Sequence, residues 1–275
     1  MDTTLIPASI REMMATGSGR LVFVGLGLHD ENGITLRGLH EIEKAEVVYA
    51  ESYTSALAEG SVERLAARTR KNITVLDRAS VEEGTRILND CQSKSVVLLV
   101  AGDPMTATTH VELRLRAIGQ GTTTDIVHGV SVITAVAGRL GLQHYKFGRT
   151  VSLPFPQEGY SPTSPYDLIA ENLSRDLHTL VLLDIDAEND RYMTANEGMH
   201  LLLDMARRTG RSAITGDSLV CAVARAGSPD CVARAGAIRE LIDLDFGGPL
   251  HSLVIPGKLH FMEVEALRVL AKASI

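Results

Sequence analysis

The stretch from Ser95 to His110, SVVLLVAGDPMTATTH, constrains the fold of this chain more than any other. It opens with a continuous apolar run, Val96–Val100, which is typical of a strand buried on both faces of a parallel sheet. Asp103 then predicts a helix cap and Pro104 the first helical position, with helix continuing through Ile118. A buried strand that ends in a small-residue turn is where open α/β sheets bind ligands, although an ordinary strand–turn–helix joint has the same pattern.

Other apolar runs alternate with helical stretches along the first half of the chain. We expect strands at 21–24, 47–50, 73–76 and 123–127, and helices at 36–44 (capped by Thr35), 61–70 and 81–92. Strands that alternate with helices predict a parallel α/β sheet.

The second half predicts another α/β domain. Ser131 is expected to cap a helix that ends near Leu140, and four prolines between 149 and 165 predict a long loop, either a lid or a linker. Further strands are expected at 179–185, 219–224 and 251–255, and helices at 167–173, 195–209, 237–243 and 261–273. The predicted organisation is a flexible extension (1–19), an N-terminal α/β domain (20–128) and a C-terminal α/β domain (129–275).

Composition excludes several functions. The formal net charge is −7, and no basic run occurs, so direct binding of nucleic acid is not expected. No apolar stretch approaches the roughly 18 residues of a membrane-spanning helix, and no secretory signal is evident. The three cysteines, Cys91, Cys221 and Cys231, form no close pair, which predicts free thiols in a reducing cytoplasm and no metal site.

The loop after the first strand, GLGLHD (25–30), resembles a dinucleotide-binding turn but differs from it at one position. Asp30 stands where the third glycine of G-x-G-x-x-G is expected. Because that glycine lets helix and strand pack closely under a diphosphate, a nucleoside without phosphates is the better fit. A nicotinamide-dependent oxidoreductase remains an alternative at this point.

Small or polar residues follow, or begin, several predicted strands from both halves. They lie at Gly25–Leu28, Gly102–Thr106, Arg225–Ser228 and His251. Each has an ordinary structural explanation, such as a turn, a cap or a histidine at the edge of the core. Together they predict a ligand cleft between the two domains. The chain has no nucleophile elbow, zinc-binding helix or phosphate loop, which favours a group transfer whose cofactor carries the reactive centre.

Several tracts match a known family in order along the chain. They are GLGLHDENGITLRGL (25–39), AESYTS (50–55), AGDPMTATTH (101–110), GLQHYKFGRTVS (141–152), LHTLVLLDI (177–185), YMTANE (192–197), ARAGS (224–228) and HSLVIPGKLHFMEVEAL (251–267). On these residues the chain resembles the diphthine synthases, S-adenosylmethionine-dependent methyltransferases of the tetrapyrrole-methylase-like class. The resemblance covers nearly all of residues 20–270, whereas the leading 19 residues lie outside it.

The resemblance implies two α/β domains with the cofactor in the cleft between them, and a homodimer. It implies methylation of the amino group of a modified histidine in translation elongation factor 2, a step of diphthamide biosynthesis that in the archaeal type ends at the trimethylated amine. The product of the cofactor is S-adenosylhomocysteine. By motif match the cofactor contacts are Leu28, Asp103, Thr106, Ser131, Val132, Leu183, Ala226 and His251, and candidates for the acceptor side are His110, Tyr145, Lys146 and Arg149.

Two other functions are alternatives at this stage. A methyltransferase of the same class that acts on a tetrapyrrole (precorrin-type) acceptor needs a cationic cleft, and both the acidic charge and YMTANE (192–197) argue against it. A non-catalytic adaptor that binds the elongation factor predicts no uptake of cofactor. The sequence identifies no general base.

Overall fold

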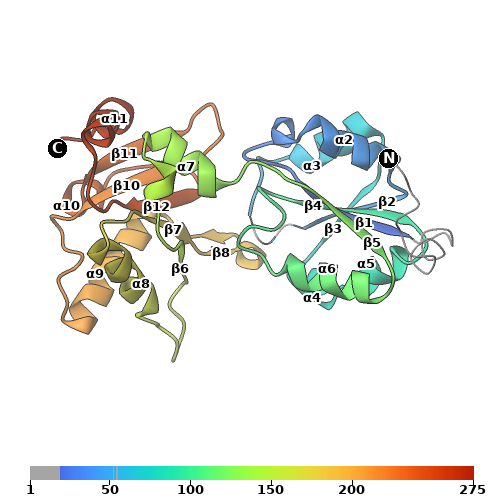
Figure 1. Ribbon diagram of the computed structural model, residues 1–275, viewed down its shortest axis with the longest axis horizontal. Coiled ribbons are helices and arrows are strands. Elements are labelled where there is room, and N and C mark those ends of the chain that lie inside the picture. The colour runs from blue at the N-terminus through green and yellow to red at the C-terminus, as the bar shows by residue number, and fades with distance from the viewer. Residues whose placement is uncertain (1–18, 52, 54) are drawn as a thin grey trace, which may run out of the picture. The chain divides into compact units, whose positions relative to one another are not determined.

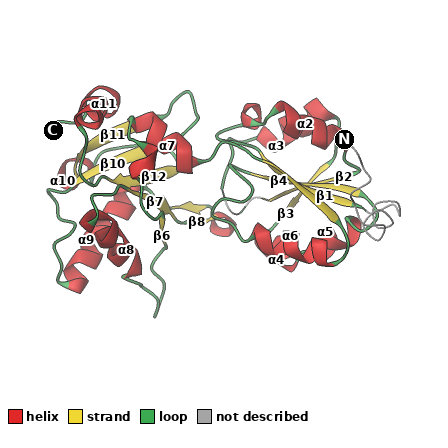
Figure 2. Cartoon of the chain, viewed as in Figure 1, coloured by secondary structure: helices red, strands yellow, loops and turns green. Residues whose placement is uncertain are grey.

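The computed structural model describes residues 19–51, 53 and 55–275 and separates into two compact units, residues 1–131 and 132–275. The predicted flexible extension 1–19 lies outside the described residues except for Gly19. The predicted boundary after residue 128 falls in the segment that joins the last strand of the first unit to the first helix of the second. Each unit contains a five-stranded sheet with helices on both faces (Figures 1 and 2).

The first unit contains an all-parallel sheet in the order β3-β2-β4-β1-β5. In chain order its elements are β1 (Arg20–Gly25), η2 (Glu31–Gly33), α2 (Leu36–Lys44), β2 (Val47–Glu51), α3 (Ser61–Thr69), β3 (Ile73–Leu76), α4 (Arg78–Glu83), α5 (Thr85–Asp90), β4 (Ser95–Val100), α6 (His110–Gly119) and β5 (Thr123–Val127). Figure 1 shows α2 and α3 on one face of this sheet and α4, α5 and α6 on the other. The predicted parallel α/β sheet is confirmed for this unit.

The two central strands, β1 and β4, are buried on both faces. On one face Phe23 and Leu98 pack with Leu113 of α6, and on the other Val22 and Val97 pack in a second cluster with residues of α2 and α3. All of the apolar run of β4 has an exposed fraction of 0%. Burying a side chain of this kind contributes about 1.5–3 kcal/mol, so these strands are a large source of stability and hold their carboxyl ends rigidly.

Two predicted helices of this unit are wrong in extent. The helix expected at 81–92 is divided into α4 and α5 at Gly84, whose φ of +67° breaks the helix. The helix expected from Pro104 begins only at His110, and the residues between them form turns in which Ala107 has a φ of +55°. The Asp103 carboxylate accepts a hydrogen bond from the Met105 amide at 3.0 Å, so it closes a local turn and does not cap α6.

The second unit contains a mixed sheet in the order β11-β10-β12-β7-β6. Its elements are α7 (Val132–Leu140), η3 (His144–Lys146), β6 (Val151–Leu153), α8 (Ser164–Ser174), β7 (Thr179–Leu183), β8 (Ile185–Asp186), η4 (Ala187–Asn189), β9 (Arg191–Tyr192), α9 (Ala195–Thr209), β10 (Leu219–Ala224), β11 (Val232–Ala237), α10 (Ile238–Leu241), β12 (His251–Ile255) and α11 (Phe261–Ala271). Helices α7 and α11 cover one face, and α8 and α9 the other (Figure 1).

Two strands of this sheet were not predicted from the sequence. β11 follows β10 without an intervening helix and pairs with it antiparallel, and β10, β12 and β7 also pair antiparallel. β6 lies inside the segment expected to be a loop, where it pairs parallel to β7 and buries Leu153. The capping box of α9 is confirmed, because the Thr194 hydroxyl accepts from the Glu197 amide while the Glu197 carboxylate accepts from the Thr194 amide.

A fully buried carboxylate joins three elements of the second unit. Glu263 of α11 accepts hydrogen bonds from Lys146 Nζ (2.5 Å), His178 Nε2 (2.9 Å) and the amides of Gln143 (2.9 Å) and His260 (2.8 Å). Burial by itself raises the pKa of Glu263, but the hydrogen bonds from the His260 amide, Lys146 and the other donors together lower it to about 2. Glu263 therefore stays ionised and fixes η3 and the start of β7 against α11.

Candidate active site

Three glycines of the first unit meet at the carboxyl ends of β1, β4 and β5. Gly25 is the last residue of β1, Gly102 follows β4 and Gly129 follows β5. A Cβ on Gly25 would lie 2.6 Å from the carbonyl oxygen of Gly102, and a Cβ on Gly129 would lie 2.3 Å from the same oxygen. The backbones touch because no side chain separates them. The result is a backbone surface at the edge of the sheet where α/β proteins bind ligands.

The hydrogen bonds of this surface argue against a diphosphate ligand. The Leu26 amide donates to the Val100 carbonyl (2.8 Å), the Gly27 amide to Gly102 (3.1 Å) and the Gly102 amide to Gly27 (2.7 Å). These donors are therefore not free to bind phosphate oxygens. The Asp30 carboxylate, which accepts from the Asn32 amide, brings negative charge to the same loop. An uncharged nucleoside or a cationic group suits this surface, and the nicotinamide alternative is not supported.

Two of the predicted cofactor residues of the first unit lie together after β4. Asp103 accepts a hydrogen bond from the Thr106 hydroxyl at 3.3 Å, and its other carboxylate oxygen lies 2.7 Å from His128 Nδ1. The Asp103 side chain is 11% exposed, whereas Leu28, in the loop after β1, is half-buried. Ser131 is the last residue of the unit. His128 was not predicted as a site residue, although its position directly after β5 parallels that of Asp103 after β4.

The predicted cofactor residues of the second unit lie mainly at one edge of its sheet. Leu183 ends β7 and His251 begins β12, and the register that pairs Ser252 with Leu182 sets these two residues opposite each other. Ala226 follows the end of β10, whose Ala224 pairs with His251. Val132, the first residue of α7, packs in the same apolar cluster as Ala226.

His251 is held by bonds to its own unit. Its Nδ1 accepts a hydrogen bond from the Ala195 amide at 3.0 Å, so the proton is on Nε2, which donates to the Gly248 carbonyl at 2.9 Å. Burial is the main cause of a lowered pKa, so the ring is neutral at pH 7. Both ring nitrogens therefore have partners within the protein, which leaves only the ring face and the backbone of this residue for contact with a ligand.

Arg225, which the sequence indicated only as the first residue of the segment Arg225–Ser228, fixes the neighbouring loop. Its guanidinium donates to the carbonyls of Phe246 (2.8 Å) and Gly248 (2.6 Å) and to the Asp230 carboxylate (2.7 Å). It thereby ties the turn after β10 to the segment before β12. Nothing in its sequence position distinguishes it from an exposed arginine.

The four acceptor-side candidates are divided between the two units. His110, at the start of α6, is buried and lines a pocket of about 240 Å³ in the first unit. The other three belong to the second unit. Tyr145 is 80% exposed, Arg149 is exposed, and the Lys146 ammonium is bound by Glu263 and by the Lys258 carbonyl.

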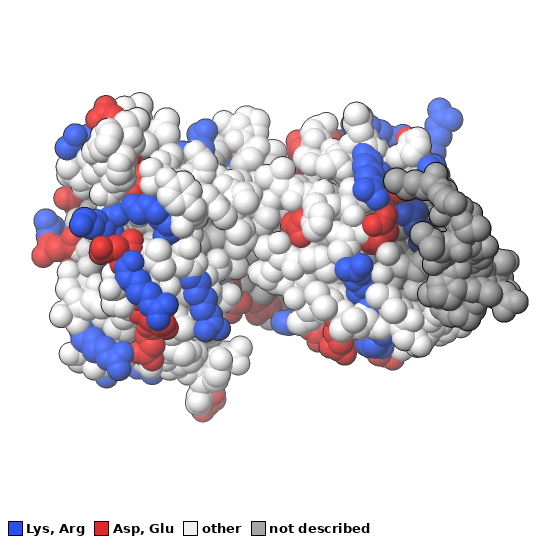
Figure 3. All heavy atoms as spheres, viewed as in Figure 1, with Lys and Arg blue, Asp and Glu red and all other residues white. Residues whose placement is uncertain are grey.

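The described residues also bear on membrane spanning, metal binding, disulfide bonds and nucleic-acid binding. Within residues 19–51, 53 and 55–275 no helix has the length and hydropathy that a membrane crossing requires, and no three potential metal ligands cluster. All three cysteines are free thiols, with Cys231 only partly buried. Figure 3 shows basic side chains interspersed with acidic ones on the face in view, without a continuous basic patch.

Comparison with known proteins assigns the chain to a class. The family model of the tetrapyrrole (corrin/porphyrin) methylases matches residues 20–242, and the chain belongs to that family. The predicted fold class, α/β of the tetrapyrrole methylase type, and the prediction of a methyltransferase are thereby confirmed.

Its relatives narrow the assignment to the diphthine synthases. The chain is 47% identical over 255 residues to the diphthine synthase of Methanocaldococcus jannaschii, and the matched region covers 92% of this chain and 99% of that protein. It is 45% identical over 251 residues to the diphthine synthase of Methanococcus maripaludis strain C5, covering 91% and 98% of the two chains. A crystal structure of diphthine synthase superposes with a TM-score of 0.84 at 39% identity, covering 92% of this chain and 96% of that one.

Proposed function

We propose that this protein is an S-adenosylmethionine-dependent methyltransferase that methylates the amino group of the modified histidine of translation elongation factor 2 in diphthamide biosynthesis. The observation that carries the proposal is the match to diphthine synthases at 45–47% identity over nearly the full length of both partners. As in the archaeal type, the expected product is the trimethylated amine. Because this acceptor is a translation factor, we also propose that the enzyme acts in the cytoplasm.

The backbone surface of the first unit supports S-adenosylmethionine as the cofactor. The amides of its loops already donate to carbonyl oxygens of the same surface, and Asp30 and Asp103 contribute carboxylates. The surface therefore favours a cationic nucleoside over a diphosphate. We propose that Leu28, Asp103, Thr106 and Ser131 hold the cofactor from one domain (20–128 and the following linker), and that Val132, Leu183, Ala226 and His251 hold it from the other. S-adenosylhomocysteine leaves as the product.

Methyl transfer depends mainly on the alignment of the reacting groups. When bound, S-adenosylmethionine supplies an electrophilic methyl carbon attached to a sulfonium. The residues of this chain have to hold the acceptor nitrogen in line with that carbon, exclude water and leave room for a growing ammonium. Such alignment lowers a barrier by up to about 7–11 kcal/mol, whereas a general base contributes roughly 10²–10⁴-fold.

The direct test is mass spectrometry of elongation factor 2 that carries the partly modified histidine, after incubation with this protein and S-adenosylmethionine. Addition of methyl groups in steps of one methyl mass, up to three, is the expected result. Methylation of a corrin or porphyrin precursor with no change in the elongation factor would instead establish the tetrapyrrole function. Absence of cofactor uptake in a calorimetric titration would leave only the role of an adaptor.

Replacing Asp103 with alanine is expected to weaken the binding of S-adenosylhomocysteine about 10- to 100-fold while the protein stays folded. The reason is that hydrogen bonds to a charged group contribute roughly 1.5–3 kcal/mol, and Asp103 lies in a turn outside the core. Isothermal titration calorimetry measures the affinity. Asp77→Ala is the matched control, because Asp77 also closes a local turn, by accepting from the Ser80 amide, at the start of α4. Unchanged affinity in the Asp103 variant would remove this residue from the site.

We also propose that the protein is a homodimer. The supporting feature is the exposed apolar side of α11, where Phe261, Met262, Val269 and Leu270 are between 50% and 72% exposed. Light scattering coupled to size-exclusion chromatography gives the mass in solution. A monomer at micromolar concentration contradicts the proposal.

A further inference from the structure

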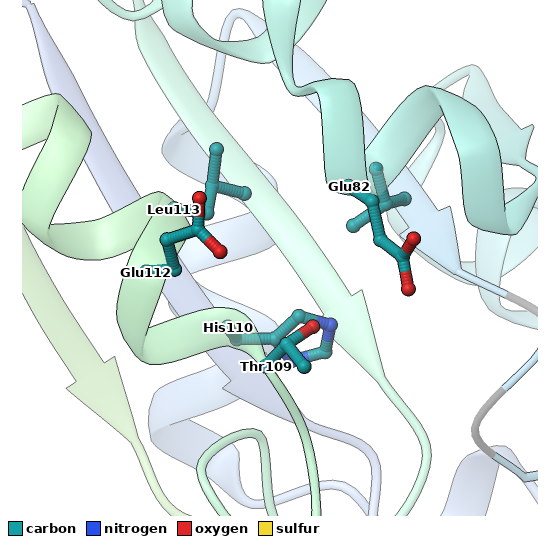
Figure 4. A pocket seen from close by; sticks show the side chains of 6 residues that line it. Glu82, Thr109, His110, Glu112 and Leu113 are labelled. Carbon is teal, nitrogen blue, oxygen red and sulfur yellow. The ribbon is translucent and has the colours of Figure 1, made fainter.

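A pocket of about 240 Å³ lies in the first unit between α4 and the start of α6. Its lining consists of Val81, Glu82, Thr109, His110, Glu112 and Leu113. Figure 4 shows Glu82 on α4 and His110 at the start of α6 on opposite sides, with the His110 ring pointing toward the α4 side. Most ligand pockets measure about 300–1,000 Å³, so this one suits a single side chain better than a nucleoside.

The position of the pocket relates it to the candidate cofactor residues. Because β3 and β4 are parallel to each other across β2, α4 and the loop before α6 leave the sheet at the same edge. That loop also contains Asp103 and Thr106, and Pro104, the neighbour of Asp103, contacts the His110 ring. The pocket therefore lies beside the loop expected to hold the cofactor.

The hydrogen bonds of His110 fix which ring nitrogen carries the proton. Its Nδ1 lies 2.9 Å from the Pro104 carbonyl oxygen. A carbonyl oxygen only accepts hydrogen bonds, so Nδ1 carries the proton and donates it. In the neutral ring Nε2 is then the nitrogen that can accept a hydrogen bond or a proton. Thr108 supports the arrangement, because its hydroxyl accepts from the His110 amide and donates to the same carbonyl oxygen.

The hydrogen bond between Nε2 of His110 and its partner, Tyr53, is weak. The Tyr53 hydroxyl lies 3.4 Å from Nε2, longer than the about 2.7–3.2 Å of a well-formed hydrogen bond. Burial, with the carboxylates of Glu51 and Glu82, raises the pKa of Tyr53 to about 12, so the phenol stays protonated and donates. A better donor that enters the pocket can displace this contact.

Charges from several elements face His110. Glu51 at the end of β2 accepts from the Tyr53 amide, and on α4 Arg78 lies 5.7 Å from the centre of the Tyr53 ring and pairs with Glu82. On α6, Glu112 lines the pocket and Arg116 binds the carbonyl oxygens of Glu82 and Glu83. Of these charged groups, two carboxylates, Glu82 and Glu112, line the pocket, whereas neither arginine does. Such a lining attracts a cation.

We propose that this pocket receives the amino group of the acceptor and that Nε2 of His110 accepts its proton. The inference rests on the proposed function and adds the identity of the proton acceptor. An alkyl amine has a pKa of about 8–10, so it enters mainly as an ammonium and cannot attack. One N–H bond breaks and its proton binds Nε2. The freed lone pair then forms the bond to the methyl carbon as the C–S bond breaks, and its electrons remain on sulfur. The imidazolium returns the proton to water.

The test compares His110→Gln with the wild type in methylation of elongation factor 2 from pH 7 to pH 10. At pH 7 the variant is expected to lose about 10²–10⁴-fold in kcat/KM. The loss should shrink as the pH rises, because the acceptor amine then loses its proton to solvent. Circular dichroism and titration with S-adenosylhomocysteine check that the variant folds and binds the product of the cofactor. These two readouts do not depend on transfer.

Each other outcome has a defined meaning. A folded, cofactor-binding variant with wild-type activity at pH 7, or with a loss that is equal at all pH values, overturns the proposal. A wild-type protein that binds cofactor but does not methylate the elongation factor shows that the proposed function itself has failed.

A second pair of variants tests the pocket without changing the histidine. Glu82→Gln is expected to raise KM for the acceptor about two- to fivefold, as an exposed charge contributes little in water, with kcat unchanged. Glu83→Gln is the matched control, because Glu83 lies on the same helix but outside the lining. Equal effects of the two variants, or no effect of Glu82→Gln, would contradict the role of the pocket.

Discussion

Replacing Glu263 with alanine is expected to lower the free energy of unfolding by about 3–5 kcal/mol at pH 7, which is the usual cost of breaking a buried charge network by removing one partner. Four donors converge on this carboxylate, and in the variant the buried His178 and two backbone amides lose their acceptor. Urea denaturation followed by circular dichroism measures the loss. Glu265→Ala is the matched control, because Glu265 lies on the same helix with 63% of its side chain exposed. Its expected effect is within about 0.5 kcal/mol.

The same network predicts a dependence on pH. The folded pKa of Glu263 is about 2, below its ordinary value of 4.5. Its contribution is therefore fully present above pH 4.5 and is lost as the pH falls toward 2. The pKa of His178 is also lowered, chiefly by burial, which adds a loss in the same direction below pH 6.5. Glu263→Ala should remove the first of these acid-linked losses, and an unchanged acid profile would contradict the assignment.

Replacing Gly129 with alanine is expected to cost about 3 kcal/mol of stability, the upper end of the usual cost of overpacking, and to abolish binding of the cofactor. The added Cβ would lie 2.3 Å from the Gly102 carbonyl oxygen and 2.9 Å from the Gly25 carbonyl carbon. Gly25 is the last residue of β1, and Gly102 lies just after β4, so relief of the clash has to separate backbone segments that form the candidate cofactor surface. Thermal unfolding and titration with S-adenosylhomocysteine measure the two effects.

Gly138→Ala is the matched control for this substitution. Gly138 lies in α7, and a Cβ there would meet nothing within 4 Å. Alanine is the better helix former, so this variant is expected to gain about 0.5–1 kcal/mol. A Gly129 variant that binds cofactor as the wild type does would show that the three loops are not part of the cofactor site.

The candidate site could be predicted from the sequence where chemistry is local. Asp103 and Thr106 are three residues apart, so their contact needs only a turn. The distant partners were not predictable. His128 reaches Asp103 from the end of β5, which β1 separates from β4 in the sheet, and Tyr53 reaches His110 from the segment after β2. Nothing in the sequence near Lys146 indicates that a carboxylate 117 residues away binds it.

The sequence by itself determined the central strands, the capping box of α9 and the family. An apolar run that is buried on both faces has one stable outcome, and a capping box closes within four residues, so neither depends on distant partners. Only the tertiary structure decided the direction of β11 and β12, the late start of α6 at His110 and the ionised state of Glu263. The strand directions and the ionised state of Glu263 depend on pairing and hydrogen bonds between segments far apart in the chain, which form only once the chain has folded. The start of α6 depends on the turns that the folded chain adopts before His110.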